Sequence, residues 1–208
     1  MKITIFGATG TIGKQLVKDA LAKNHQVTAF GRNMDKLNAF KNKNLTKQKG
    51  DVFNTIDVDE SVKGMDAVII VLGAGRNGRV RAEGTLNIIN AMKQNNVERL
   101  ICQSTLGAGE SNENLNFFWK NIMFGWFLKP AFLDHELQEK HVKNSGINWT
   151  IVRPAAFTNG EKTGRYKHGF DASEKSLSLK ISRADVSDFL LNQLHSDKYL
   201  LKTPGLSY

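Results

Sequence analysis

This sequence has little of several residue types that mark particular classes of protein. It contains a single cysteine, Cys102, among 208 residues, which excludes an internal disulfide and indicates a reducing compartment. The thiol falls within an apolar run, so we expect it to be buried and structural. Only three prolines are present, and the chain has no internal repeat and no long low-complexity tract. A repetitive or linker-rich architecture is therefore excluded.

The amino terminus leaves no space for a signal peptide, because an apolar run that predicts a strand begins at residue 2. A cytoplasmic protein is therefore the expectation. With 40% hydrophobic and 24% charged residues, the composition is that of an ordinary globular protein, and the length predicts one domain over residues 1–208. No metal ligands are predicted.

Acidic residues are fewer than basic ones, and the formal net charge is +9. Such a charge attracts nucleic acid, anionic membranes or anionic small molecules. No nucleic-acid-binding motif is present, and the lysines fall at positions that predict a solvated face. We therefore expect no nucleic acid partner, no membrane partner, and a monomer or homodimer. The basic clusters comprise Lys41, Lys43, Lys47, Lys49, Arg76, Arg79 and Arg81.

Three glycines near the amino terminus form the most informative motif. Gly7, Gly10 and Gly13 follow a short apolar run that predicts a strand, and helical spacing begins at Lys14. In this context the first glycine permits a tight turn, the second lets a pyrophosphate approach the backbone, and the third lets helix pack closely on strand. The N–H groups at the positive end of the helix favour a bound diphosphate. The alternative is a sharp turn that binds nothing.

The end of the second predicted strand, residues 26–30, indicates which dinucleotide is bound. An acidic residue there would bind the ribose 2′-hydroxyl and repel a 2′-phosphate. Gly31 and Arg32 follow this strand instead, and a guanidinium can hold a phosphate through two hydrogen bonds. The sequence thus predicts NADP(H) as the preferred cofactor and NAD(H) as the alternative. The other interpretation of Arg32 is a side chain that faces water.

Strands and helices alternate along the rest of the chain. Further strands are expected at residues 44–51, 66–72, 97–102 and 147–153, and helices at 54–63, 80–96, 130–144 and 183–194. This alternation predicts an α/β fold with a doubly wound parallel sheet, a Rossmann fold of three αβα layers. Another short strand is expected within residues 163–170. The part from about residue 104 to 208 is expected to supply the substrate side of the cleft.

Two hydroxyl side chains, Ser104 and Thr105, follow the strand at 97–102. Ligands of such sheets bind outside the carboxyl ends of the strands. We therefore expect Ser104 to hydrogen-bond the substrate or the carboxamide of the cofactor. The alternative is a turn serine that caps backbone groups.

Aromatic residues are concentrated in residues 117–128. This stretch is too short to span a bilayer, and Lys120 and Asn121 interrupt it. Three interpretations are open: a buried helix, an aromatic wall over a planar substrate, or a dimer or membrane surface. Packing as a buried helix is the preferred interpretation. The substrate wall is the second, because the stretch follows the strand that would carry the chemistry.

Several motifs now coincide: Gly7–Gly13, Gly31-Arg32, Gly50-Asp51-Val52, Asp134-His135 and Ser145–Pro154, with Thr163–Tyr166, Ile181–Val186 and Asp197–Tyr199 in the tail. Together they resemble the atypical short-chain dehydrogenase/reductase (NmrA-like) group of NAD(P)H-binding proteins over nearly the whole chain. The most similar branch is the one that contains biliverdin reductase B, also called flavin reductase. The resemblance implies a one-domain Rossmann fold that binds NADPH and passes hydride to a flavin-like, quinone or other planar conjugated acceptor.

The resemblance also assigns site residues by position. The residues implied to bind the cofactor are Gly7, Thr9, Gly10, Thr11 and Ile12 at the diphosphate, Arg32 at the 2′-phosphate, Asp51 and Val52 at the adenine, Leu72 and Gly73 at the ribose, and also Ser104, Thr105 and Pro154. Ser104 matches the active-site serine of the branch. Tyr166 and His135 are the candidate proton donors.

The chain departs from these relatives in two places. The Tyr-x-x-x-Lys pair of classical short-chain dehydrogenases is absent, since no tyrosine precedes residue 166, and Ala156 stands where the reductase branch carries a histidine. Alcohol oxidation with a tyrosine base is therefore not expected. Reduction of a flavin or quinone needs mainly proximity and stacking, with solvent protonating the product. A redox sensor that binds NADP(H) without catalysis is the second hypothesis, and a sugar epimerase is the third.

Overall fold

The computed structural model describes residues 1–76 and 78–208. Its centre is an eight-stranded sheet in the order β3-β2-β1-β4-β5-β6-β10-β8, in which only the pairing of β8 with β10 is antiparallel. These strands are β1 Lys2–Phe6, β2 Gln26–Gly31, β3 Leu45–Lys49, β4 Ala67–Ile70, β5 Arg99–Gln103, β6 Asn148–Pro154, β8 Lys167–His168 and β10 Gly205–Ser207. A second sheet pairs β7 Ala156–Thr158 with β9 Lys180–Ser182.

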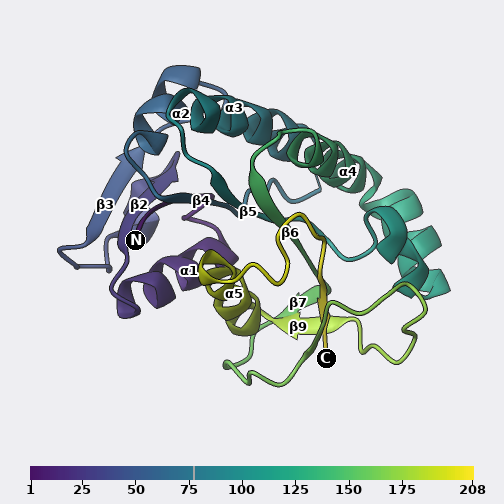
Figure 1. Ribbon diagram of the computed structural model, residues 1–208. Helices are drawn as coiled ribbons and strands as arrows, with labels where there is room; N and C mark the ends of the chain where they lie inside the picture. The colour runs from purple at the N-terminus through teal and green to yellow at the C-terminus, as the bar shows by residue number, and fades with distance from the viewer. Residues whose placement is uncertain (77) are drawn as a thin grey trace.

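Helices cover both faces of the large sheet (Figure 1). On one face lie α1 Thr11–Ala22 and α5 Arg183–Asn192, and on the other lie α2 Thr55–Val62, α3 Val80–Gln94 and α4 Lys129–Lys143. The shorter elements are the 3-10 helices η1 Met34–Leu37, η2 Gly109–Asn114 and η4 Gln193–His195, and the π-helix η3 Phe118–Phe127. The predicted three-layer α/β fold with a mostly parallel sheet is confirmed.

The central strands have apolar side chains on both faces because helices cover both. In β1, Ile3 and Ile5 pack in the core beneath α1 and α5, whereas Phe6 packs on the side of α2 and α3. The side chains of β4 likewise alternate between the two faces of the sheet, and every residue of the strand is buried. This explains why its sequence is a continuous apolar run instead of an alternating one.

The tail forms more structure than the sequence indicates. The strand expected within residues 163–170 is limited to β8, and β10 joins β6, with Ala155 N–H donating to Leu206 O at 2.9 Å. The small β7–β9 sheet was not anticipated. Strands of two or three residues are too short to show a hydrophobic period, so the sequence offered no signal for them.

The expected buried packing of residues 117–128 is wrong. No residue of η3 is buried, and Phe117 and Trp126 are 74% and 78% exposed. The single thiol follows the prediction: Cys102 is fully buried in β5, and burial raises its pKa far above the usual range. Within residues 1–76 and 78–208, no helix combines the length and the apolar character that crossing a bilayer requires.

The strand order determines where a ligand can bind. The chain runs outward from β1 through β2 to β3 on one side, and then returns to β4 on the other side of β1. The connections therefore diverge between β1 and β4, leaving a crevice at the carboxyl ends of these strands. Open α/β sheets bind their ligands at such a position.

Candidate functional site

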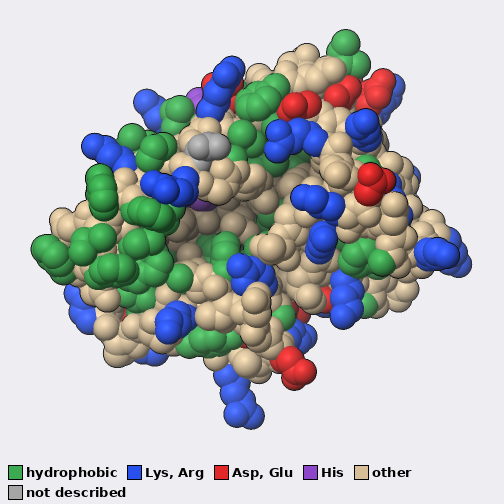
Figure 2. Space-filling model, turned by 180° about the vertical axis from the view of Figure 1, so that it is seen from behind, with side chains coloured by type: hydrophobic (Ala, Val, Ile, Leu, Met, Phe, Trp, Pro, Cys, Tyr) green, Lys and Arg blue, Asp and Glu red, His purple; other side chains and the backbone are tan. Residues whose placement is uncertain are grey.

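A cavity of about 480 Å³ opens at the carboxyl ends of the parallel strands. This volume is typical of small-molecule sites. The molecular surface is hollowed beside a cluster of hydrophobic side chains (Figure 2). Among its lining residues are fourteen that the sequence analysis named: Gly7, Thr9, Gly10, Thr11, Ile12, Arg32, Asp51, Val52, Leu72, Gly73, Ser104, Thr105, His135 and Pro154. Their individual roles toward a ligand stay predictions.

The glycines of the first turn differ in what they permit. Gly7 has φ +86°, and a Cβ there would lie 2.5 Å from Val71 O. A Cβ on Gly13 would lie 2.1 Å from Gly7 O. A Cβ on Gly10 would meet only Gly7 O, at 3.2 Å, and Gly10 borders the cavity. The first and third glycines are therefore required by the fold, whereas the second keeps the cavity open against the backbone.

The amino terminus of α1 is suited to an anion. Gly10 is its N-cap residue, no side chain caps the helix, and its first turn contains no acidic residue. The first N–H groups of a helix have no partner within the helix, and the helix dipole adds positive potential there. This cradle fits a diphosphate, since the backbone supplies donors and no side chain occupies the space.

The end of β2 adds positive charge to the cavity. Arg32 and Lys36 are exposed and line it, and neither forms an ion pair with a described residue. Next to them, the turn after β3 is held in place by two hydrogen bonds. Asp51 N–H donates to Asp57 Oδ2 at 3.1 Å, and Phe53 N–H donates to Asp51 Oδ1 at 3.1 Å. The part of the cavity next to Arg32 thus combines two cations with the apolar side chains of Val52 and Phe53.

Two buried polar atoms at the end of β5 lack ordinary hydrogen bonds. Gln103 Oε1 and Ser104 Oγ are both buried without a partner, although both residues line the cavity. Ser104 lowers the pKa of the Glu139 carboxyl but makes no hydrogen bond of ordinary length and angle. Buried polar atoms are nearly always satisfied, so these two fit a ligand with polar groups. The interpretation of Ser104 as a backbone-capping serine is wrong.

His135 of α4 lines the cavity, and two successive hydrogen bonds connect it to α3. Its Nδ1 lies 3.3 Å from Gln138 Oε1, and Gln138 Nε2 donates to Thr85 Oγ1 at 3.0 Å. An amide oxygen only accepts, so the proton of the imidazole lies on Nδ1 and Nε2 is an acceptor. Burial and the nearby Arg81 cation lower the pKa of His135 to about 3. A neutral imidazole of this tautomer is a poor proton donor at Nε2, which corrects the expectation for this residue.

Asp134, next in sequence to His135, joins α4 to the start of α3. Its carboxylate accepts the N–H groups of Arg81 and Ala82 at 3.0 and 2.9 Å, and Arg81 Nη1 lies 3.3 Å from Asp134 Oδ2. A carboxylate at a helix amino terminus is stabilised by the helix dipole. The contacts between Asp134 and Arg81 thus hold the Arg81 side chain in the cavity lining. They also fix α4, the helix that carries His135, against α3.

Aromatic residues form one wall of the cavity. Trp119 and Phe124 of η3 line it together with Leu128. The Phe124 ring stacks on Phe132 of α4, with 4.8 Å between ring centroids. The interpretation of residues 117–128 as an aromatic wall is therefore supported for one face of the π-helix.

Tyr166 does not line the cavity. Its ring packs against Phe189 of α5 and His168 of β8. Burial and the nearby Asp188 and Asp185 carboxylates raise its pKa to about 12. A role as proton donor to a ligand in the cavity has no support in this position.

Sequence reasoning missed several lining residues. Phe53 and Gln103 directly adjoin assigned motifs, so their places after β3 and at the end of β5 could have indicated them. Lys36 lies four residues after Arg32, and the sequence analysis assigned it no role. Arg81 carried no such signal, because its position depends on the packing of α4 against α3.

The comparisons with known proteins agree with this geometry. The UPF0659 protein YMR090W of Saccharomyces cerevisiae is 27% identical to this chain, over 99% of this chain and 92% of that protein. The oxidoreductase ylbE of Lactococcus lactis has a similar structure, with a TM-score of 0.82 and 25% identity over 100% of this chain and 90% of that one. A short-chain dehydrogenase/reductase of Veillonella parvula, solved with NADP, has a TM-score of 0.85 at 19% identity, covering 100% of this chain and 94% of that one.

The finer assignment to the biliverdin reductase B branch stays a prediction. The family profile described as NAD(P)H-binding matches residues 7–197, which include the glycine turn, the end of β2, the strand β5 and helix α4. This chain belongs to the NAD(P)H-binding family.

Proposed function

We propose that this protein is an NADPH-dependent reductase that transfers hydride to a planar conjugated acceptor of the flavin or quinone type. The observation that carries the proposal is the combination of features in one cavity. The glycine turn and Arg32 border it at the end of β1 and β2, and the aromatic side chains of Trp119 and Phe124 border it as well. A dinucleotide held along the strand ends would therefore have a flat apolar surface beside it.

The residues present fit NADPH. The open backbone at Gly10 and the uncapped start of α1 would hold the diphosphate. Arg32 and Lys36 would hold the 2′-phosphate, which is also why NADPH is preferred to NADH in this proposal. The unpaired oxygens of Gln103 and Ser104 suit a carboxamide, which offers an N–H₂ group and an acceptor oxygen.

When bound, NADPH supplies a hydride. That hydride would bring two electrons and one proton to the acceptor, and water would supply the second proton. Trp119 and Phe124 orient a planar acceptor by stacking and exclude water from its face. The Nε2 atom of His135 can accept a hydrogen bond, because its Nδ1 carries the proton, so it would favour substrates that carry an N–H or O–H group.

The test is NADPH oxidation by the purified protein with a panel of flavins, quinones and tetrapyrroles. We expect turnover with at least one acceptor, and a lower kcat in Ser104→Ala with an unchanged melting temperature. Ser111→Ala is the matched control, because Ser111 Oγ is also buried but donates to Ala108 O. Tight NADPH binding without oxidation by any acceptor would refute the reductase.

A redox sensor without catalysis is the second candidate. One observation favours it: the lining within the described part of the chain includes no tyrosine to act as a proton donor. A sensor would bind NADPH and NADP⁺ and change its association with another protein between the two states. Turnover with any acceptor at a rate comparable to related reductases would decide against the sensor.

A further inference from the structure

We propose that the outer face of η3 docks on an anionic lipid surface, from which the protein takes an acceptor dissolved in the lipid. We call this surface the aromatic face and define it by Phe117, Phe118, Ile122, Trp126 and Phe127. The choice of acceptor rests on the reductase function proposed above. The docking itself does not depend on it.

The side chains of the aromatic face are exposed. Its side chains are 41% to 78% exposed, and Leu133 and Leu137 of the adjacent α4 are also exposed. Hydrophobic side chains gather on one side of the molecule, beside the hollow (Figure 2). Large rings at this exposure are unfavourable in water, and a contiguous apolar patch marks an interaction site.

The same short helix borders the cavity from the other side. Trp119 and Phe124 line the cavity, whereas Phe118, Ile122 and Trp126 project outward. The wall between the cavity and the aromatic face is therefore a single helix. A molecule held by the aromatic face would lie within one helix diameter of the proposed hydride transfer site, about 10 Å.

Basic residues accompany the aromatic face. The Arg76 guanidinium lies 3.8 Å above the Phe127 ring, and its Nε donates to Phe127 O at 3.2 Å. Lys129, the first residue of α4, is exposed, and Lys120 lies within η3, where it forms an ion pair with Glu113 at 3.2 Å. Aromatic rings flanked by Lys and Arg are the composition of peripheral anchors, in which rings enter the interface and cations meet anionic headgroups.

Charge decides between a lipid surface and a second copy of this chain. A symmetric dimer through the aromatic face would bring Arg76 and Lys129 of each copy toward those of the other, and each copy carries a net charge of +9. Such an arrangement is repulsive. An anionic lipid surface is attracted by the same charges. This inference differs from the expectation that no membrane is involved, since the sequence alone did not show that the rings face outward.

Flotation with lipid vesicles tests the docking. We expect the protein to float with phosphatidylglycerol vesicles, to float weakly with phosphatidylcholine vesicles, and to be released by salt. Trp126→Ser and Lys129→Glu should weaken binding to anionic vesicles about tenfold or more. The matched controls are Ile56→Ser, at an apolar side chain of α2 that is 69% exposed, and Lys43→Glu, at an exposed lysine elsewhere.

Two results would overturn the docking. One is the absence of wild-type binding to anionic vesicles. The other is a dimer in analytical ultracentrifugation that Trp126→Ser converts to a monomer, because the aromatic face would then be an interface between copies. NADPH titration of each variant shows that the cofactor site is intact.

The acceptor is tested with two quinones under the same conditions, one soluble in water and one with a long isoprenoid tail dissolved in the vesicles. Trp126→Ser should lower the rate with the lipid-dissolved quinone about tenfold and leave the rate with the soluble one unchanged. Equal rates for both quinones in wild type and variant would refute the lipid-dissolved acceptor. Vesicle binding without oxidation of either quinone would refute the reductase and leave the docking standing.

Discussion

At the scale of single residues, the glycine turn separates requirements of the fold from requirements of binding. Gly7 and Gly13 face neighbouring backbone, whereas Gly10 faces the cavity. A pattern of three equally spaced glycines does not reveal this difference. The distances from each glycine to the nearest backbone atoms reveal it. Substitutions at these positions can therefore measure the effect on folding and the effect on binding separately.

We expect Gly10→Val to weaken NADPH binding about tenfold or more, because the side chain would fill the diphosphate cradle. Its melting temperature should change little, since φ at Gly10 is −75° and any residue adopts it. Gly13→Ala should instead lower stability by about 1–3 kcal/mol through overpacking. Calorimetric titration and thermal melts measure the two effects, and Gly160→Val, at an open surface position, is the control.

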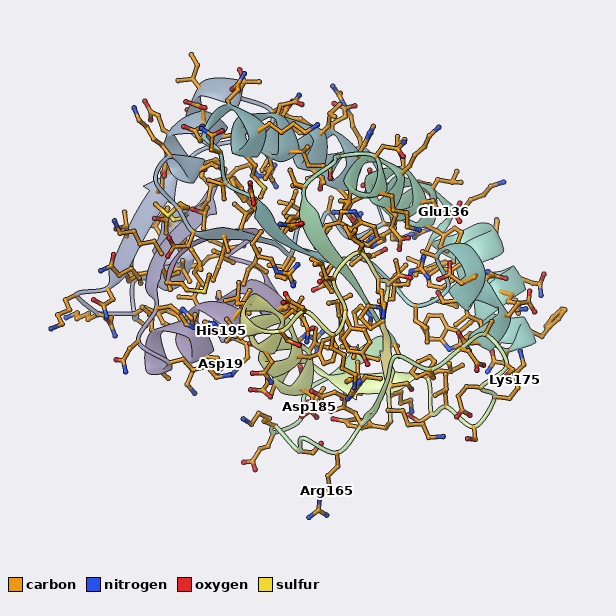
Figure 3. The ribbon with its side chains drawn as sticks, viewed as in Figure 1. Asp19, Glu136, Arg165, Lys175, Asp185 and His195 are labelled. Atoms are coloured by element: carbon orange, nitrogen blue, oxygen red, sulfur yellow. The ribbon has the colours of Figure 1, made fainter. Side chains whose placement is uncertain are left out.

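Arg32 is expected to select the cofactor. Arg32→Ala should raise the Kd for NADPH about tenfold or more and leave the Kd for NADH nearly unchanged, because only NADPH carries the 2′-phosphate. Arg165→Ala is the control, since that side chain extends away from the molecule (Figure 3). Equal losses for the two dinucleotides would contradict the assignment of Arg32.

His135 should make stability depend on pH. Its pKa is lowered to about 3, so between about pH 3 and its usual value the unfolded chain binds a proton that the folded chain does not. The free energy of unfolding should therefore fall as the pH falls through this window. The full contribution of His135 is present only above its unfolded pKa of 6.5.

Urea unfolding at pH 7.5, 6 and 5 measures this effect. In His135→Gln, the slope of the free energy of unfolding against pH should be smaller by up to about 1.4 kcal/mol per pH unit. His25 and His168 also have pKa values lowered mainly by burial and remain in both proteins. Glu110, Glu139 and Asp185 have lowered pKa values, so they lose their contribution only at more acidic pH. Identical slopes for variant and wild type would show that His135 is not held neutral.

At the scale of elements, a buried arginine joins β6 to α4 and η2. Arg153 is fully buried, and its Nε and Nη2 donate to the two oxygens of Glu139 at 2.8 and 2.6 Å. Its Nη1 donates to Glu110 Oε1 at 2.7 Å, and Glu110 also accepts the hydroxyl of Thr203 at 2.9 Å. The guanidinium lowers the pKa of both carboxyl groups. This network holds α4, and with it His135, against the sheet.

Arg153→Met should destabilise the protein by about 3–5 kcal/mol, because it leaves the buried Glu139 carboxylate with only the partly exposed Lys143 as an ion-pair partner. The double variant Arg153→Met with Glu139→Leu should lose less free energy of unfolding than Arg153→Met alone. Glu110→Gln should cost about 1 kcal/mol or less, since that side chain is largely exposed. Chemical denaturation of the three variants measures their free energies of unfolding and so tests this order of stability. A double variant less stable than the single one would contradict it.

The elements also show what the sequence could predict. The buried strands β1, β2, β4, β5 and β6 and the helices between them were predictable from apolar runs and spacing, as was the position of the glycine turn. Helix α4 shows the limit. Its buried face includes Asp134, Gln138 and Glu139, whereas Leu133 and Leu137 are exposed.

The sequence predicted a helix at residues 130–144, but hydrophobic periodicity could not predict that its buried face is polar, because the partners that satisfy those groups lie in α3 and β6. The π-helix η3 has the opposite character, with rings that remain exposed. Both departures lie at the cavity. Sites that bind ligands are where local sequence rules are expected to fail.

At the scale of the whole molecule, the cavity is lined from both halves of the chain. Gly7–Ile12, Arg32 and Asp51 come from the first half, and Ser104, Trp119, His135 and Pro154 from the second. A dinucleotide that spans the strand ends would contact both halves and bind only the folded state. Binding of this kind stabilises the fold by RT ln(1 + [L]/Kd).

NADPH at about 100 times its Kd should therefore stabilise the protein by about 2.7 kcal/mol. In a chain of this size, that corresponds to a rise in melting temperature of about 5–11 °C. Adenosine 2′,5′-bisphosphate at the same multiple of its own Kd should give the same rise, because the stabilisation depends only on this ratio. At equal concentrations it should give a smaller rise, since it lacks the part that would reach Ser104. An equal rise at equal concentration would show that the second half of the cavity contributes nothing to cofactor binding, and would remove the basis for hydride transfer beside Trp119 and Phe124.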